Sequence, residues 1–302
     1  HMLKDYKTRV SGTYEILKLT LEELNKEHKT LRSLINKADQ YTASEEFRSK
    51  KLPVDFTPTD DSTIVNFEGI QYDVVKSELT GAQWFQYGDE PENFEIPYFN
   101  DLQPAAEVNL PEYYIIPPEW IDVIKRIHLH GIKTMKLSKE LDIQVETFKF
   151  RNVSWNSSPY EGRQRIRDFE TDTIHHMQKF PEGSVVIDMN QSLARVIAHI
   201  LEPVAPDSYL KWGFFNAIFE QKEYAEMYLM EEMAREMLKN NEQIRKAFEE
   251  KKKNDPNFTK SPWRMLNWFY MQTPYWDEKK NVYPVGRVVD EKAVSVVKEA
   301  VQ

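Results

Sequence analysis

The sequence predicts an α+β protein with helices at both ends and a strand-rich, sandwich-like middle. Apolar residues recur every three or four positions before residue 48 and again after Pro203, as on one face of a helix. Between these regions, short alternating or apolar runs are separated by prolines and glycines, which is typical of strands joined by turns. We therefore expect a helical segment over 1–49, a β-rich module with one inserted helix over 50–202, and a helical region packed on that module over 203–302.

The N-terminal segment predicts a pair of helices that face a core. The same apolar spacing continues on both sides of a polar patch near Asn25, and it includes Val10, Tyr14, Leu17, Leu21, Leu24, Leu31, Leu34, Ile35 and Ala38. The opening His1-Met2-Leu3 suggests a cut point rather than a natural start. A helix that begins there suggests that it belongs to a preceding domain.

The middle region predicts many short strands. Two apolar runs, 63–67 and 70–74, flank Glu68-Gly69, which suggests a hairpin with its turn at that glycine. Further strands are expected over 94–98, 113–116, 143–150, 162–177, 185–187 and 196–200. The inserted helix is expected from Pro117 to Gly131, because proline suits a first turn and glycine ends a helix.

The C-terminal region predicts several separate helices. A long helical segment runs from Pro203 to a break at Asn240-Asn241, and a second helix runs over 242–253. Another opens after the cap Ser261 and continues to residue 272, and a short one closes the chain. The segment 275–289 is aromatic and is expected to lie extended against the body.

Composition excludes several classes of protein. Of the 302 residues, 40% are hydrophobic and 13% aromatic, which is enough for a core and unlike a disordered chain. The net charge of −9 argues against general affinity for nucleic acid. The absence of cysteine excludes disulfides, thiolate zinc sites and cysteine nucleophiles. No apolar run approaches the roughly 20 residues that span a bilayer.

The seven histidines give no metal or catalytic site that we can assign. His199 and Glu202 fit the spacing H-x-x-E that opens some zinc sites, but no later histidine supplies a third ligand. No serine–histidine–acid set, Walker loop or dinucleotide-binding glycine motif is present. We therefore predict no catalytic residue and no metal ligand in this chain.

Three arginines on the strand expected over 162–177 are the first binding candidates. Arg163, Arg165 and Arg167 alternate, so they share one face of a strand. Their guanidinium groups could clamp a carboxylate. A solvated strand whose charges prevent edge pairing is the alternative.

The stretch from Glu202 to Leu238 is the second candidate, because aromatic residues and methionines concentrate in it. Met227, Met230, Met233 and Met237 share one side of a helix, which suits packing or a domain interface more than a ligand groove. With Arg163 and Arg165, we single out as candidate binding or interface residues Trp212, Tyr224, Met230 and Trp276.

Several stretches resemble bacterial zinc carboxypeptidases of the carboxypeptidase-A-like type. Residues 3–14 resemble the sequence segment that follows the catalytic glutamate in that family. The remaining stretches resemble the long C-terminal extension of its multidomain members: Pro159–Arg163, Leu201–Pro203, Pro206–Ser208, Trp212–Asn216, Phe219–Glu226, Thr273–Asp277 and Tyr283–Arg287.

The resemblance implies a non-catalytic role. In the family a zinc ion held by two histidines and a glutamate activates water, and another glutamate is the base; none of these motifs is carried onto this chain. The chain then resembles a truncated piece of a protein that hydrolyses peptides. Its expected partner is the missing peptidase domain of the same polypeptide, which would hold the zinc, and the family suggests a periplasmic or secreted location.

Two other functions stay open. The β-rich module could bind carbohydrate, cell-wall peptide or a protein through exposed aromatic side chains such as Trp84, Trp155 or Trp276. An independent hydrolase would need two carboxylates that face each other across a pocket.

Overall fold

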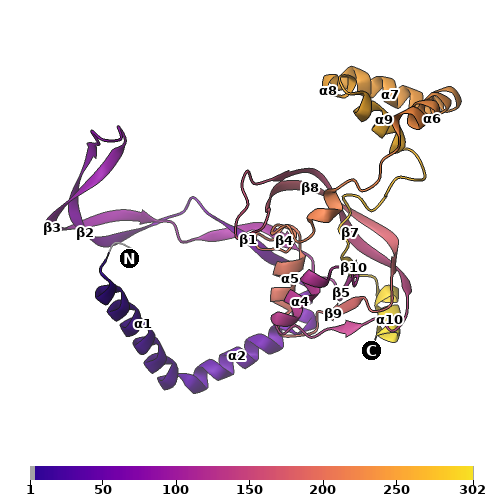
Figure 1. Cartoon of the computed structure of the whole chain (residues 1–302). Coiled ribbons are helices and arrows are strands. Elements are labelled where there is room, and N and C mark those ends of the chain that lie inside the picture. The colour runs from indigo at the N-terminus through magenta and orange to yellow at the C-terminus, as the bar shows by residue number, and fades with distance from the viewer. Residues whose placement is uncertain (1–3, 302) are drawn as a thin grey trace.

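A six-stranded antiparallel sheet forms the centre of the protein, in a computed structural model that describes residues 4–301 (Figure 1). The strand order is β6-β9-β5-β10-β7-β8. Thus β10, from the end of the chain, lies between two strands from its middle. The bounds are β5 Tyr113–Ile116, β6 Met135–Lys136, β7 Leu141–Trp155, β8 Ile166–Phe180, β9 Val185–Asp188 and β10 Gly286–Val288.

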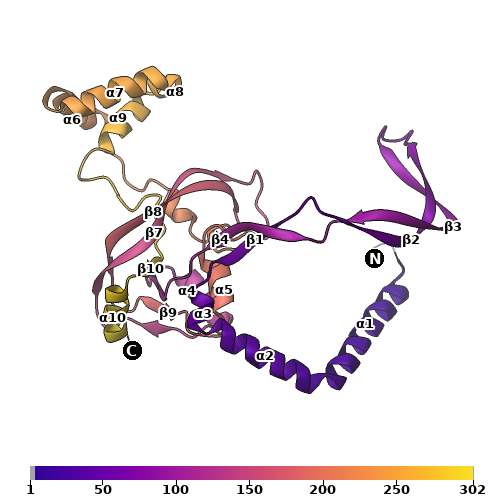
Figure 2. The same ribbon diagram turned by 180° about the vertical axis from the view of Figure 1, so that it is seen from behind.

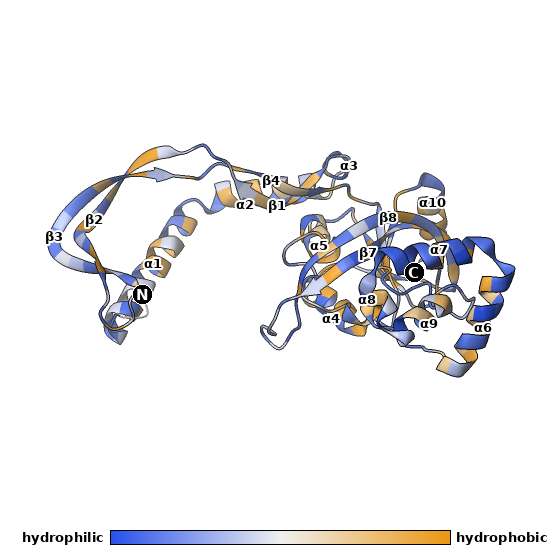
Figure 3. Cartoon of the chain, turned by 90° about the horizontal axis from the view of Figure 1, so that it is seen from above, coloured by the Kyte–Doolittle hydropathy of each residue, from blue (hydrophilic) through white to orange (hydrophobic). Residues whose placement is uncertain are grey.

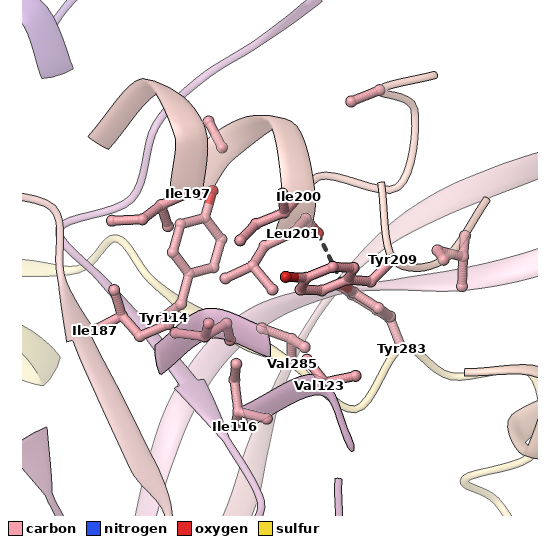
Figure 4. Packing of buried hydrophobic residues seen from close by; sticks show 14 of the residues in the cluster. Tyr114, Ile116, Val123, Ile187, Ile197, Ile200, Leu201, Tyr209, Tyr283 and Val285 are labelled. Atoms are coloured by element: carbon pink, nitrogen blue, oxygen red, sulfur yellow. Dashed lines mark hydrogen bonds between the residues drawn. The ribbon is translucent and has the colours of Figure 1, made fainter. Parts of the chain in front are cut away.

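Helices cover both faces of this sheet, because side chains alternate along each strand. Tyr114 and Ile116 of β5 belong to a core shared with α4 (Ile121–Leu129) and α5 (Ala194–Leu201) (Figure 4). Tyr113 and Ile115 lie in a second core with α10 (Glu291–Ala300). Buried aromatic and aliphatic side chains on both faces hold the sheet together.

The C-terminal helices form a lobe with a core of its own. It contains α6 (Met227–Asn240), α7 (Glu242–Asn254), α8 (Pro256–Thr259) and α9 (Pro262–Tyr270). Their shared core includes Met230, Ala234, Phe248, Phe258, Phe269 and Tyr270. Figures 1 and 2 show the lobe standing away from the sheet, joined to it by two extended connections. The first of these follows the short 3₁₀ helix η1 (Asn216–Phe219).

The N-terminal third forms two arms that extend from the body (Figures 1 and 2). One arm is helical, with α1 (Tyr6–Lys26) and α2 (His28–Thr42), and α3 (Glu45–Arg48) joins it to the body. The other arm is a pair of antiparallel ribbons. Its bounds are β1 Leu52–Pro58, β2 Thr63–Lys76, β3 Gln83–Tyr98 and β4 Leu102–Val108.

The arms leave much apolar surface open to solvent. Neither α1 nor α2 has a buried residue, and Leu17 and Leu21 are 58% and 65% exposed. In Figure 3 hydrophobic residues recur along α1 and along the β2–β3 ribbon. The accessible surface is 21088 Å², whereas a compact monomer of this mass exposes about 13,000 Å². The arms therefore present more surface than a standard protein interface needs.

The α+β class and most of the expected elements are confirmed. The chain outside the middle forms helices at both ends, and strands occur at 94–98, 113–116, 143–150 and 185–187 as expected. The predicted domain boundaries stay a prediction. The suggested cut at His1–Leu3 lies outside the described residues.

The predicted hairpin turn at Glu68-Gly69 is wrong. Strand β2 continues through both residues, and the turn falls between β2 and β3. A Cβ atom on Gly69 would meet Cε2 of Phe94 at 2.8 Å. This glycine therefore makes room for an aromatic ring on the neighbouring strand instead of bending the chain.

Three further expectations fail. The helical segment expected from Pro203 is wrong over its first part, because within 203–226 only η1 is helical and α6 begins at Met227. Residues 196–200 lie in helix α5, not in a strand, because the buried positions begin at Ala194 and follow helical spacing: Ala194, Ile197, Ala198, Ile200 and Leu201. The N-terminal helices do not face a core within residues 4–301, since their apolar stripe is exposed. In the described part of the chain no helix is both long and apolar enough to span a membrane.

Candidate functional site

A row of polar side chains crosses the face of the sheet that α5 covers. Arg287 of β10 pairs with Tyr114 of β5 on one side and with Glu146 of β7 on the other. Directly opposite residues on neighbouring strands point to the same face. The register alone therefore brings these three side chains together. Arg287 is 4% exposed, although it carries a full charge.

Glu202 joins this row from the end of α5. It is the C-cap residue of α5, and Pro203 follows it, which prevents the helix from continuing. The end of the helix is held in place by the Tyr283 hydroxyl, which donates to the carbonyl of Leu201 at 2.8 Å (Figure 4). The Glu202 side chain, 1% exposed, therefore points at the sheet from a fixed position.

The Arg287 guanidinium links the carboxylates. Its Nε donates to Glu202 Oε1 at 3.0 Å, and Nη1 forms an ion pair with Glu146 Oε1. Nη2 donates to the carbonyl of Asn109, and the Tyr114 hydroxyl also donates to Glu202 Oε1. Every nitrogen of the guanidinium thus has an oxygen partner, as a buried charge requires.

A cavity of about 240 Å³ lies beside this group. Its walls carry carboxylates, hydroxyl groups and apolar side chains together with Arg287. Besides Arg287, the lining residues are Glu107, Val108, Asn109, Glu146, Phe148, Thr171, Thr173, Glu202, Pro203 and Val204. Glu202 Oε2 is buried and has no hydrogen-bond partner among the described residues. A buried acceptor without a partner is costly, so this atom is the one open position in the group.

Burial controls the protonation of these groups. It raises the pKa of Glu202 to about 7, while the Tyr114 hydroxyl that donates to it acts in the opposite direction. Burial also raises the pKa of Tyr114 and of Tyr283 well above the ordinary range. It lowers the pKa of Arg287. A carboxyl group in a cavity with a raised pKa is a feature of functional sites, although structural ion pairs share it.

Arg163, Arg165 and Trp212 meet at a different place. Arg163 donates from Nη2 to the Gly213 carbonyl at 3.0 Å and lies over the ring of Phe214. Arg165 lies over the Trp212 ring, 4.2 Å from its centre. Arg163 and Arg165 precede β8, so the strand expected over 162–177 begins only at Ile166 and does not carry these two arginines. Their contacts tie the connection between β7 and β8 to the loop after α5. Whether they also bind a ligand stays a prediction.

The other three candidates lie elsewhere. Met230 is buried in the core of the α6–α9 lobe, and Trp276 packs edge-on against Tyr270 at the margin of that core. Tyr224, in the connection before α6, is 72% exposed. The structure therefore does not bring these three residues to the arginines. Their role as an interface stays a prediction.

The aromatic residues offered as a binding surface are also scattered. Trp84 lies on β3 and is 48% exposed. Trp155 is half-buried at the end of β7, where its Nε1 donates to Asn216 Oδ1 at 3.2 Å. Trp276 lies in the tail beside the lobe. They form no common groove with the cavity, since none of them lines it.

Sequence reasoning considered Glu202 only as a partner of His199 and missed Glu146 and Arg287. His199 does not line the cavity, and burial lowers its pKa. Over residues 4–301, no group of three or more histidine, aspartate or glutamate side chains is placed to hold a metal ion. The available signal was a single arginine inside the apolar run Val285 to Val289.

Carboxypeptidases are similar to part of this chain. Carboxypeptidase 2 of Trichophyton rubrum is 31% identical over 111 residues, which cover 37% of this chain and 20% of that protein. Carboxypeptidase 2 of Trichophyton tonsurans is 32% identical over 124 residues, with 40% and 23% covered. A probable carboxypeptidase 2 of Trichophyton verrucosum is 28% identical over 147 residues, with 46% and 28% covered.

These matches make the chain carboxypeptidase-related over part of its length. The chain spans only 20% to 28% of the length of these relatives. The relatives are fungal, so the bacterial grouping and the position in a C-terminal extension stay predictions. No family model matches the chain. No solved structure matches it either.

The raised pKa of Glu202 predicts a pH-dependent stability. The Glu202 carboxyl group has a pKa of about 7 in the folded state and the ordinary value of 4.5 in the unfolded chain. Between these values the folded state holds more protons, so its stability is greatest at the acid end and falls as the pH rises. The loss is at most about 3 kcal/mol and is complete above the folded pKa.

Urea unfolding of the protein and of Glu202→Gln between about pH 5 and about pH 8 checks this, because glutamine cannot titrate. The difference in unfolding free energy between the two proteins should change with pH in that window. The titratable or charged groups that face Glu202, namely Tyr114, Tyr283, Arg287 and Glu146, remain in both proteins. If the unfolding free energies of the two proteins changed in parallel with pH, the raised pKa of Glu202 would be contradicted.

Proposed function

We propose that this chain is the non-catalytic C-terminal region of a zinc metallocarboxypeptidase-like protein. Two observations support the proposal. Sequence similarity to carboxypeptidases covers part of the chain, and the chain spans a minor part of those relatives. The apolar stripe on α1 and α2 is exposed, which is unusual for a soluble surface of this extent.

The exposed stripe carries the proposal. Tyr14, Leu17 and Leu21 are each more than half exposed, and burying one such leucine contributes about 1.5 to 3 kcal/mol. Isolated helices are only marginally stable in water, and most helices gain their stability from a packed apolar face. We infer that α1 and α2 pack against another structure. The occupant that we propose is the peptidase domain of the same polypeptide, because residues 3–14 resemble the end of such a domain.

In this arrangement the preceding domain supplies the chemistry. It would hold the zinc ion and hydrolyse the peptide substrate, and the present chain would cover part of its surface and shape access to it. The residues of this chain then act through packing. The exposed aromatic and aliphatic side chains of the arms are the contact surface that we assign to this role.

The first test concerns the docking of α1 and α2. The coding sequence upstream of residue 1 should contain an H-x-x-E motif and a later histidine. Hydrogen exchange of the longer polypeptide should then show α1 amides protected relative to the chain of residues 1–302, while amides of α7 in the lobe stay unchanged. Equal exchange of α1 in the two proteins, or an upstream sequence without the motif, would rule out this docking.

The second test concerns activity. Purified 1–302 should release no C-terminal amino acid from peptides and should retain no stoichiometric zinc after dialysis, because we place the catalytic groups in the preceding domain. Metal analysis and a peptidase assay measure both quantities. Turnover together with one bound zinc per chain would overturn the non-catalytic role.

A binding module is the second candidate function, and the cavity beside Glu202 favours it. The cavity combines a buried acceptor without a partner with apolar walls, which is typical of small-ligand sites. The aromatic residues first considered for such a module do not line it. A ligand of this module would therefore be recognised by the carboxylates that line the cavity.

A further inference from the structure

The cavity beside Glu202 is the feature that the docking role does not use. We propose that it binds a primary ammonium group carried on a short apolar stem. The inference deepens the binding-module alternative and is independent of the proposed docking of α1 and α2, which lie in a separate arm.

Charge is the first argument. Three carboxylates line the cavity, from Glu107, Glu146 and Glu202, and Arg287 is the one cationic side chain among the lining residues. Each nitrogen of its guanidinium already has an oxygen partner in Glu202, Glu146 or the Asn109 carbonyl. Its charge is thus paired within the protein. Among the lining residues the carboxylates outnumber this one cation, so the charge that remains in the cavity is negative.

The unpartnered oxygen is the second argument. Glu202 is 1% exposed, its Oε1 accepts from Tyr114 and Arg287, and its Oε2 has no partner in the described chain. An ammonium group has three donors and no acceptor, so it complements a carboxylate oxygen without creating a new unsatisfied atom. The hydroxyl groups of Thr171 and Thr173, which also line the cavity, can accept its other N–H bonds.

The shape of the cavity sets the size of the ligand. Val108, Phe148, Pro203 and Val204 form apolar parts of the wall, which suit a hydrocarbon stem. The volume is about 240 Å³, and a cavity of about 150 Å³ holds benzene. Val204 and Glu107 line the cavity and are exposed, so the cavity is open to solvent at these residues. A five-carbon amine fits this description, as does the end of a lysine side chain.

Calorimetry of 1–302 with pentylamine tests the proposal, at a pH above the Glu202 pKa of about 7, where this carboxyl group is ionised. Pentan-1-ol has the same stem without the charge, and pentanoate has the opposite charge. We expect pentylamine to bind at least about tenfold more tightly than pentan-1-ol, which corresponds to about 1.4 kcal/mol, and pentanoate not to bind. Nα-acetyl-lysine amide distinguishes a lysine side chain of a peptide from a free amine as the source of the ammonium group. Tighter binding than that of pentylamine indicates a peptide lysine, and weaker binding indicates a free amine.

Three variants locate the binding. Glu202→Gln should weaken pentylamine binding about tenfold or more, and Glu107→Gln at the exposed mouth should weaken it severalfold even if the first variant folds poorly. Glu95→Gln on the β2–β3 arm makes the same change of charge far from the cavity and should have no effect. Equal binding of amine and alcohol, no binding of pentylamine, or equal effects of Glu95→Gln and Glu107→Gln would overturn the proposal.

Discussion

The buried guanidinium of Arg287, held between Glu202 and Glu146, is the constraint on which the body of this protein depends. One side chain from the three-residue strand β10 meets β7, β5 and the end of α5. Transfer of a charge out of water is costly, and only complete pairing offsets that cost. The pairing therefore favours one register of β10 and one position of the α5 terminus.

Other contacts support the same placement of the chain end. Thr147 donates from its hydroxyl to the carbonyls of Tyr283 and Val285 at 2.8 and 3.1 Å. A Cβ on Gly286 would meet Cζ of Phe180 at 2.6 Å, so the glycine makes room on β10 for this ring from β8. Packing and hydrogen bonds thus position β10. The pairing of the buried Arg287 charge favours the same register.

Local patterns in the sequence predicted local structure, and they failed where distant residues decide. The helix after Ser261 and the strand at 113–116 follow from capping and from a short apolar run. Gly69 was misjudged because its role is set by a ring on another strand. The cavity was missed for the same reason, since Glu202 and Arg287 are 85 positions apart and meet only through the sheet. Sequence spacing carries no signal for such a pair.

The most direct test of this constraint is a comparison of two arginine substitutions by urea unfolding. Arg287→Met leaves two carboxylates without their buried partner, and we predict a loss of about 3 to 5 kcal/mol. Arg151→Met removes an exposed pair with Asp172, and its cost should stay below about 1 kcal/mol. Adding Glu202→Gln to Arg287→Met should restore part of the loss. If Arg287→Met costs no more than Arg151→Met, the buried guanidinium does not organise the fold.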